Sequence, residues 1–154
     1  MSTLQSPRQK AREMAFQFLY RFDQESGPDM SPAEIESDFR HHTRHFGDFE
    51  HSVEFALRLI QTTLKELSLV DRAIESVSQN WKFDRIGAVD KAFLRIGAAE
   101  LLFFKDVPAS VTLNEIIELS KAFGEEDTPL FLNGILDPIS KLPEAVADKV
   151  PSDS

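Results

Sequence analysis

The stretch TPLFLNGIL, residues 128–136, decides the fold because its letters support two incompatible local structures. Asn133-Gly134 between apolar residues is a strong signal for the tight turn of a β-hairpin. Thr128-Pro129, by contrast, is typical of a helix start, with a capping side chain followed by proline at the first helical position. The apolar residues that follow recur with the helical period of about 3.6, and no alternating segment flanks them. The sequence therefore predicts a helix through Asn133-Gly134.

Glycine inside a predicted helix needs an explanation, because it costs about 1 kcal/mol relative to alanine. For Gly134 the simplest explanation is the close approach of another helix, which a missing Cβ permits. Gly87 and Gly97 lie in a predicted long helix that opens at Asp84, and they allow the same interpretation.

Helical periodicity also covers most of the chain before this stretch. The first helix is expected over residues 8–22, with one apolar stripe, and Gly27-Pro28 ends that unit. Another helix is expected from about residue 110 or 112 to 123, closed by Gly124. Further helix starts are predicted at Ser31-Pro32, Asp48, Ser68 and Asp84. With six or seven helices, no convincing strand and short connections, the expected fold is an all-α, compact bundle of about seven helices.

The composition is that of a globular protein with one domain. The 154 residues are 42% hydrophobic and 28% charged, and no apolar run approaches the ~20 residues that a membrane span needs. The N-terminus lacks the apolar region of a signal peptide. The absence of cysteine excludes disulfides, cysteine nucleophiles and thiolate metal sites. We therefore expect a cytoplasmic protein with no membrane segment.

The charge is strongly acidic but uneven. A net charge of −9 argues against a non-specific nucleic-acid binder, whose affinity comes from Lys and Arg at phosphates. Residues 1–21, however, carry four basic residues and one acidic residue. A small basic end on an acidic body can still bind an anion locally.

Motifs for catalysis or metal binding are missing. His41 and His45 have the i, i+4 spacing that could share a metal, but HTRH lacks the glutamate of the zinc-protease motif HExxH, so we interpret these residues as a solvated polar face. The sequence contains neither a glycine-rich phosphate loop nor a GxSxG motif. We expect no catalytic residue, no metal and no cofactor.

The first predicted helix carries aromatic residues away from its apolar stripe. Arg12, Phe16 and Tyr20 form an i, i+4, i+8 line, with Gln17 and Arg21 beside it. In one interpretation a second layer of helices covers the two rings. In the other, arginine meets phosphate and the rings stack on unpaired bases of single-stranded nucleic acid. The two interpretations are compatible if Phe16 is buried and Tyr20 lies at the rim.

Three segments resemble the NusB transcription antitermination factors. They are AREMAFQFLY at 11–20, VDKAFLRIGAAEL at 89–101, and DVPASVTLNEIIELSKAFGEEDTPLFLNGILD at 106–137. The resemblance spans residues 8–142, with 25–60 weakly marked. It implies two small helical subdomains, no enzymatic activity, and binding of single-stranded boxA RNA as a heterodimer with ribosomal protein S10. This complex joins transcribing RNA polymerase and suppresses termination, notably in ribosomal RNA operons.

The resemblance also implies site residues. For RNA they are Arg8, Lys10, Arg12, Tyr20, Lys121, Asp127, Phe131 and Asn133; for S10 they are Asp84 and Asp90. The Asn133 amide could read a base edge, since it offers both a donor and an acceptor. Gly134 would leave room for a nucleotide or a helix, and Phe131 fits either stacking or the core. Arg12→Ala and Asn133→Ala are expected to weaken RNA capture without unfolding the protein.

Several positions depart from the family pattern toward fewer cations. Relatives often have lysine where this chain has Leu130 and Pro138, and their tails are commonly basic. We therefore expect weaker RNA binding alone and a stronger dependence on S10. The alternative is a NusB-like module that acts mainly through protein contacts. A weak homodimer is a further alternative. Residues 1–7 are expected to form a flexible arm, 8–142 the helical domain, and 143–154 a frayed acidic tail.

Overall fold

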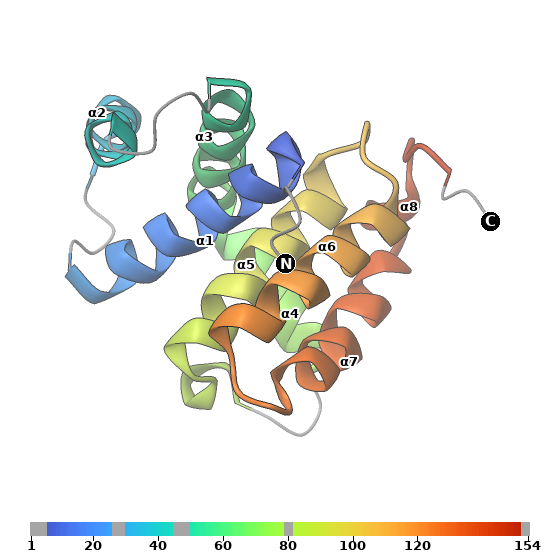
Figure 1. The fold of residues 1–154 in the computed structure, drawn as a ribbon. Coiled ribbons are helices and arrows are strands. Elements are labelled where there is room, and N and C mark those ends of the chain that lie inside the picture. Colours follow the sequence, from blue (N-terminus) through green and yellow to red (C-terminus); the bar gives the residue numbers. More distant parts are fainter. Residues whose placement is uncertain (1–5, 26–29, 45–49, 79–81, 152–154) are drawn as a thin grey trace. The chain divides into compact units, whose positions relative to one another are not determined.

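The computed structural model describes residues 6–25, 30–44, 50–78 and 82–151, and every regular element in these ranges is a helix (Figure 1). The all-α prediction is confirmed. The helices are α1 (Pro7–Glu25), α2 (Pro32–Thr43), α3 (Glu50–Lys65), α4 (Leu67–Val77), the 3₁₀ helix η3 (Phe83–Arg85), α5 (Ala88–Phe103), α6 (Ala109–Phe123), α7 (Thr128–Ser140) and α8 (Pro143–Val146). The chain divides into two compact units, residues 1–61 and 62–154, and each is described by itself.

In the first unit, α1 buries the stripe that its periodicity predicts. Phe18 of α1 stacks on Phe22, with ring centroids 6.0 Å apart, and meets Phe39 of α2 edge-on at 5.9 Å. Such aromatic pairs add about 0.5–1.5 kcal/mol beyond their buried area. The remaining buried members of the stripe are Ala11, Met14, Ala15 and Leu19.

Helix α2 begins as the sequence predicts. The Ser31 hydroxyl accepts from the Glu34 N–H at 3.2 Å, and the Glu34 carboxylate accepts from the Ser31 N–H at 3.1 Å. This is a capping box with Pro32 in the first turn. The pKa of Glu34 is lowered mainly by its hydrogen bond with the Ser31 backbone and, to a smaller extent, by the one with the Ser31 side chain. The predicted cap Asp48 and the histidine His45 lie outside the described residues.

In the second unit, α5 is the central helix and packs against α4, α6, α7 and α8. Most of its side chains are buried; Phe93, Leu94, Ile96 and Leu101 have no exposed surface. Helices α6 and α7 lie side by side (Figure 1). Helix α7 continues through Asn133-Gly134, so the prediction of a helix rather than a hairpin turn is confirmed.

The glycines of this unit have different roles. A Cβ on Gly97 would lie 2.9 Å from the Leu136 Cδ1, so this glycine permits the contact between α5 and α7, as predicted. A Cβ on Gly134 would meet no atom of another element within 4 Å, so the predicted helix contact is wrong there. The same holds for Gly87, which is the N-cap of α5 rather than part of a long helix.

Two predicted helix starts are wrong in the second unit. Asp84 lies in η3, because extended backbone at Ile86 and Gly87 separates that turn from α5. Ser68 lies inside α4, whose N-cap is Glu66 without a side-chain cap. The helix start predicted at Thr128-Pro129 is confirmed to within one residue, because α7 begins at Thr128 with Asp127 as its N-cap.

Contacts at the corner between α6 and α7 explain why glycine occupies position 124 and threonine position 128. The Thr128 hydroxyl accepts from the Glu125 N–H at 2.9 Å. A Cβ on Gly124 would lie 2.7 Å from the Thr128 side chain. The predicted end of α6 at Phe123 is confirmed, and close approach, rather than a left-handed conformation, requires the glycine.

The C-terminal segment, residues 143–151, differs from the frayed tail that its composition suggested. Ala145 of α8 is buried, and Lys149 Nζ donates to the carbonyls of Glu100, Leu101 and Phe104 at 3.2, 3.2 and 2.8 Å. The last carbonyls of a helix have no partner within the helix. Lys149 supplies that partner at the end of α5 and ties this segment down.

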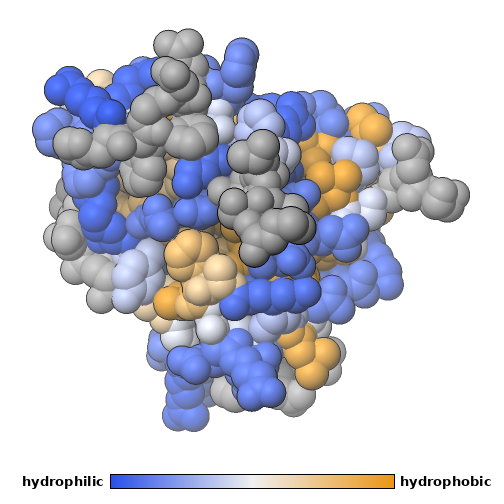
Figure 2. Space-filling model, viewed as in Figure 1, coloured by the Kyte–Doolittle hydropathy of each residue, from blue (hydrophilic) through white to orange (hydrophobic). Residues whose placement is uncertain are grey.

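The surface is mainly hydrophilic on the face shown in Figure 2, with separate hydrophobic groups among the polar ones. The exposed large hydrophobic residues of the described ranges are Tyr20, Leu69, Val111, Leu130, Val146 and Val150. No helix in these ranges combines the length and apolar character that crossing a bilayer requires.

Candidate nucleic-acid and partner surfaces

Two arginines of α1 lie against an aromatic ring of α3. The guanidinium carbon of Arg8 lies 4.5 Å from the Phe55 ring centroid, and that of Arg12 lies 5.3 Å from it. Arg8 is exposed, but Arg12 is only 1% exposed. Arg12 therefore lacks the accessible surface that a direct phosphate contact needs, which corrects the expectation from sequence. It shares the ring that positions Arg8.

Lys10 and Arg21 are both paired with carboxylates. Lys10 Nζ lies 3.5 Å from the Glu13 carboxylate, one turn along α1. Arg21 donates to Asp38 of α2 at 2.9 Å and lies over the Phe18 ring. This ion pair joins α1 to α2, so a structural role is enough to explain an arginine at position 21.

The two rings on the outer line of α1 divide as the combined interpretation predicts. Phe16 is 4% exposed and belongs to the core, whereas Tyr20 is 39% exposed. Their ring centroids are 6.3 Å apart, so the buried ring supports the exposed one. Tyr20 can therefore offer a ring surface and a hydroxyl to a ligand, while the buried Phe16 ring packs beside it.

Helix α7 presents Asn133 without a structural partner. Its side chain is exposed and forms no hydrogen bond within the described part of the chain. Gly134 beside it is exposed, with open space around its Cα. Leu130, one turn earlier, is 78% exposed, while Phe131 is half-buried and shares in the packing. This surface has hydrogen-bonding capacity and room.

Lys121 and Asp127 lie at the two ends of the α6–α7 corner. Lys121 pairs with Glu118 at 2.9 Å, and both side chains are mostly exposed, so the pair is weak and exchangeable. Asp127 is exposed at the N-cap position of α7. Asn133 follows it by about 9 Å along the helix axis, at about 1.5 Å per residue.

Asp90, one of the two residues expected to meet S10, belongs to this same corner. It is half-buried in the first turn of α5, and its carboxylate accepts from the Thr128 hydroxyl at 3.3 Å. Burial raises the pKa of Asp90; the Thr128 hydrogen bond opposes this, and the charges of Asp127 and Glu125 add to it. Asp90 and Asp127 therefore influence each other electrostatically.

Asp84, the other residue expected to meet S10, is exposed in η3, at a cleft of about 530 Å³. Two cations cover the Phe83 ring of this cleft, Lys91 at 4.7 Å and Arg95 at 5.2 Å. Arg95 also donates twice to Asp71, at 3.0 Å each. Periodicity did not reveal this cluster, because its members come from three separate helices.

The eight candidate RNA residues fall equally into the two units. The first unit holds Arg8, Lys10, Arg12 and Tyr20; the second holds Lys121, Asp127, Phe131 and Asn133. The exposed members of this set are Arg8, Tyr20, Lys121, Asp127 and Asn133. No group of three or more potential metal ligands occurs among the described residues.

Comparisons of the sequence and of the structure with known proteins point to the same family. A sequence model of the NusB family matches residues 9–141. A protein named transcription antitermination protein NusB from Geotalea daltonii is 41% identical over 142 residues, covering 90% of this chain and 98% of the relative. The structure of T. maritima NusB gives a TM-score of 0.79 at 32% identity, covering 94% of this chain and 97% of that chain. A chain from the crystal structure of the antitermination factors NusB and NusE in complex with dsRNA gives 0.76 at 29% identity, covering 90% and 98%.

Proposed function

This chain belongs to the NusB family of transcription antitermination proteins, and from that premise we propose that it binds single-stranded, boxA-type RNA as a heterodimer with ribosomal protein S10. The bound complex joins transcribing RNA polymerase and promotes processive transcription, notably of ribosomal RNA operons. The relative crystallised with NusE, another name for S10, and with dsRNA supports both classes of partner.

The exposed amide of Asn133 is the observation that carries the RNA proposal. An amide donor and acceptor with no partner in the fold can pair with a base edge, which is accessible when the base is unpaired. The open space at Gly134 allows the nucleotide backbone to come close. Keeping two poor helix formers at an exposed site costs stability without a packing benefit, which is consistent with a binding role.

The first helix contributes a ring and a cation to the same function. Tyr20 stacks on a base, and Arg8 meets a phosphate while Phe55 holds its guanidinium. Arg12 supports Arg8 from beneath rather than touching RNA. In the second unit, Lys121 adds a phosphate contact, and Asp127 accepts a hydrogen bond from a base or sugar.

S10 binds through Asp84, at the mixed-charge cleft beside η3, and through Asp90 at the α6–α7 corner. Charge complementarity to a basic partner fits the acidic character of this chain. Since this chain lacks the lysines that relatives often carry at Leu130 and Pro138, RNA capture depends strongly on S10.

The test measures fluorescence anisotropy of a labelled single-stranded boxA-like RNA, with and without S10, across a salt series. Tyr20→Ala is expected to weaken binding by about 5-fold to 150-fold, because stacking contributes about 1–3 kcal/mol per base. Asn133→Ala is expected to weaken it by about tenfold.

Leu130→Ala is the matched control on the same helix, since it removes an exposed side chain with no hydrogen-bonding group. Circular dichroism should show equal helicity in all three variants. Wild-type RNA affinity in both Tyr20→Ala and Asn133→Ala would refute the assigned RNA surface. Equal affinity with and without S10 would instead contradict the dependence on the partner.

A further inference from the structure

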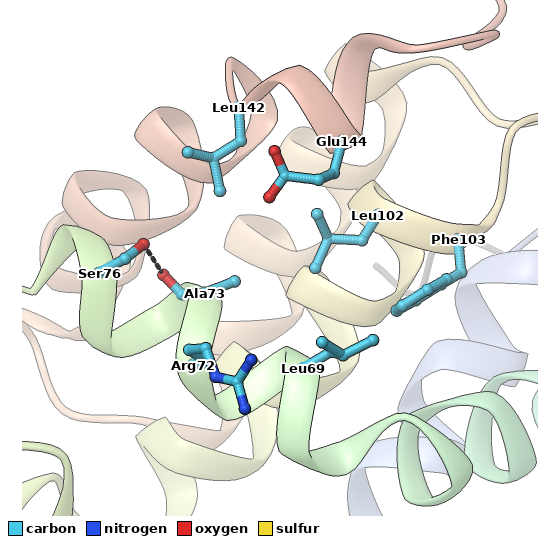
Figure 3. Close-up of a pocket in the computed structure, with 8 residues that line it drawn as sticks. All are labelled: Leu69, Arg72, Ala73, Ser76, Leu102, Phe103, Leu142 and Glu144. Carbon is cyan, nitrogen blue, oxygen red and sulfur yellow. Dashed lines mark hydrogen bonds between the residues drawn. The ribbon is translucent and has the colours of Figure 1, made fainter.

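The second unit has a hydrophobic groove that is lined by none of the residues assigned to RNA or S10. It has a volume of about 430 Å³. Figure 3 shows α4 forming one wall with Leu69, Arg72, Ala73 and Ser76, α5 contributing Leu102 and Phe103, and the start of the C-terminal segment forming the other wall with Leu142 and Glu144. Leu69, at the mouth, is 48% exposed.

The groove is lined by two side chains of opposite charge, Arg72 and Glu144. The Ser76 hydroxyl donates to the Ala73 carbonyl of its own helix at 2.7 Å, so it is already used (Figure 3). Within the described residues, neither the Arg72 guanidinium nor the Glu144 carboxylate forms an ion pair or hydrogen bond. An apolar surface thus lies between an unpaired cation on one wall and an unpaired anion on the other.

Both walls are fixed to the rest of the unit: α4 packs on α5 and α7, and hydrogen bonds hold the wall beside α8. Lys105 Nζ donates to the Glu144 carbonyl at 2.6 Å, and the Val150 N–H donates to the Lys105 carbonyl at 2.9 Å. Lys149 adds its three hydrogen bonds to the end of α5. The groove is therefore preformed, which removes an ordering cost from binding.

This combination of features narrows the class of ligand. A nucleic acid would meet an unpaired carboxylate and mostly apolar surface, which is unfavourable for phosphates. An amphipathic helix places apolar side chains on one face at i, i+3 or i+4, and i+7, with charges flanking them. Such a face matches both the apolar floor and the two separated charges.

We propose that this groove binds an amphipathic helix of a partner protein. Apolar anchors of that helix enter between Leu69 and Leu142, an acidic side chain faces Arg72, and a basic one faces Glu144. This contact is separate from those proposed for RNA and S10, so the protein can hold a further component of a complex through α4 and the C-terminal segment.

The experiment uses two synthetic amphipathic helical peptides of the same composition. One carries glutamate at its N-terminal end and lysine at its C-terminal end, and the other has these two exchanged. Titration of each into the ¹⁵N-labelled full chain should move the amide signals of the groove residues, with one charge order binding more tightly. The double variant Arg72→Glu, Glu144→Arg should invert that preference.

Leu69→Glu is expected to weaken the preferred peptide by about tenfold or more, because it removes a central apolar anchor and introduces a charge. Binding of boxA-like RNA and S10 should stay at wild-type level in this variant, which separates this proposal from the previous one. Thermal melts confirm folding of each variant.

Three outcomes would overturn the proposal. The first is that neither peptide shifts the groove signals. The second is that the charge-reversed variant keeps the wild-type preference. The third is concentration-dependent self-association in sedimentation that Leu69→Glu abolishes, because the groove would then be occupied by a second copy of this chain.

Discussion

Helices α1 and α7 present their site residues in opposite ways. On α1 the cations lie against rings and carboxylates, with Arg8 and Arg12 sharing Phe55. On α7 the amide of Asn133 is exposed and has no partner in the described fold. The buried Arg12 of α1 therefore contributes to stability, whereas no contact in the described fold depends on the Asn133 side chain. Substitution should affect folding at Arg12 and RNA binding at Asn133.

The strongest test of this contrast is Arg12→Ala. Because Arg12 is buried on Phe55, its loss should lower the free energy of unfolding by about 2–3 kcal/mol. Urea unfolding followed by circular dichroism measures this value. Lys10→Ala on the same helix is the control, expected to change stability by less than about 0.5 kcal/mol. A fully stable Arg12→Ala that binds RNA weakly would restore the direct-contact role expected from sequence.

The next test compares two glycines. Gly97→Ala should lower the free energy of unfolding by about 1–2 kcal/mol, because its Cβ would press on Leu136 in the core. Gly134→Ala should raise it by up to about 1 kcal/mol, since helix propensity improves and no atom is near. Thermal denaturation distinguishes the two.

In the same Gly134→Ala variant, RNA binding should weaken although stability rises, because the new methyl group limits the approach of a nucleotide. If RNA affinity is unchanged, the space at this position has no role in binding.

A smaller effect is expected from Leu130→Lys, which gives α7 the exposed cation that relatives often carry there. RNA affinity should increase severalfold at low salt, and the slope of log K against log salt should steepen by about 0.7 for one more phosphate contact. The free energy of unfolding should not change. An unaltered slope would mean that RNA does not pass this part of α7.

The smallest effect concerns Asp90, whose pKa is raised, first by burial. An acid with a raised pKa destabilises the fold above that pKa, and this effect is relieved as pH falls through it. Asp90→Asn keeps the acceptor for Thr128 and removes the charge, so it should raise stability at pH 7 by under about 0.5 kcal/mol after solvent screening. The gain should vanish in acid, which a pH series of urea unfolding would show. Weaker S10 binding by the same variant would support Asp90 as a partner contact.

Local signals predicted a large part of the fold. The 3.6-residue period located α1, α6 and α7, and Ser31-Pro32 marked the start of α2, because a capping box involves only neighbours in the chain. The error at Asp84 arose because extended backbone at Ile86 and Gly87 precedes α5. The error at Ser68 arose because α4 follows α3 through Glu66, which forms no side-chain cap.

The candidate site was predictable in its residue types but not in their accessibility. Tyr20 and Phe16 occupy the same line of one helix, yet only the packing of the other elements makes one a surface ring and the other a core ring. Gly97 and Gly134 likewise look alike in sequence, and only a neighbouring side chain distinguishes them. The groove beside α8 could not be read from sequence, because its walls are far apart along the chain.

The sequence by itself determined the helical class, most helix limits and, through its motifs, the family, since these depend on local period, capping and ordered segments. Tertiary structure alone decided that Arg12 is buried, that Asn133 is exposed and that Lys149 holds the C-terminal segment on α5. The reason is physical: burial and long-range hydrogen bonds depend on which helices meet, and no short window of residues contains that information.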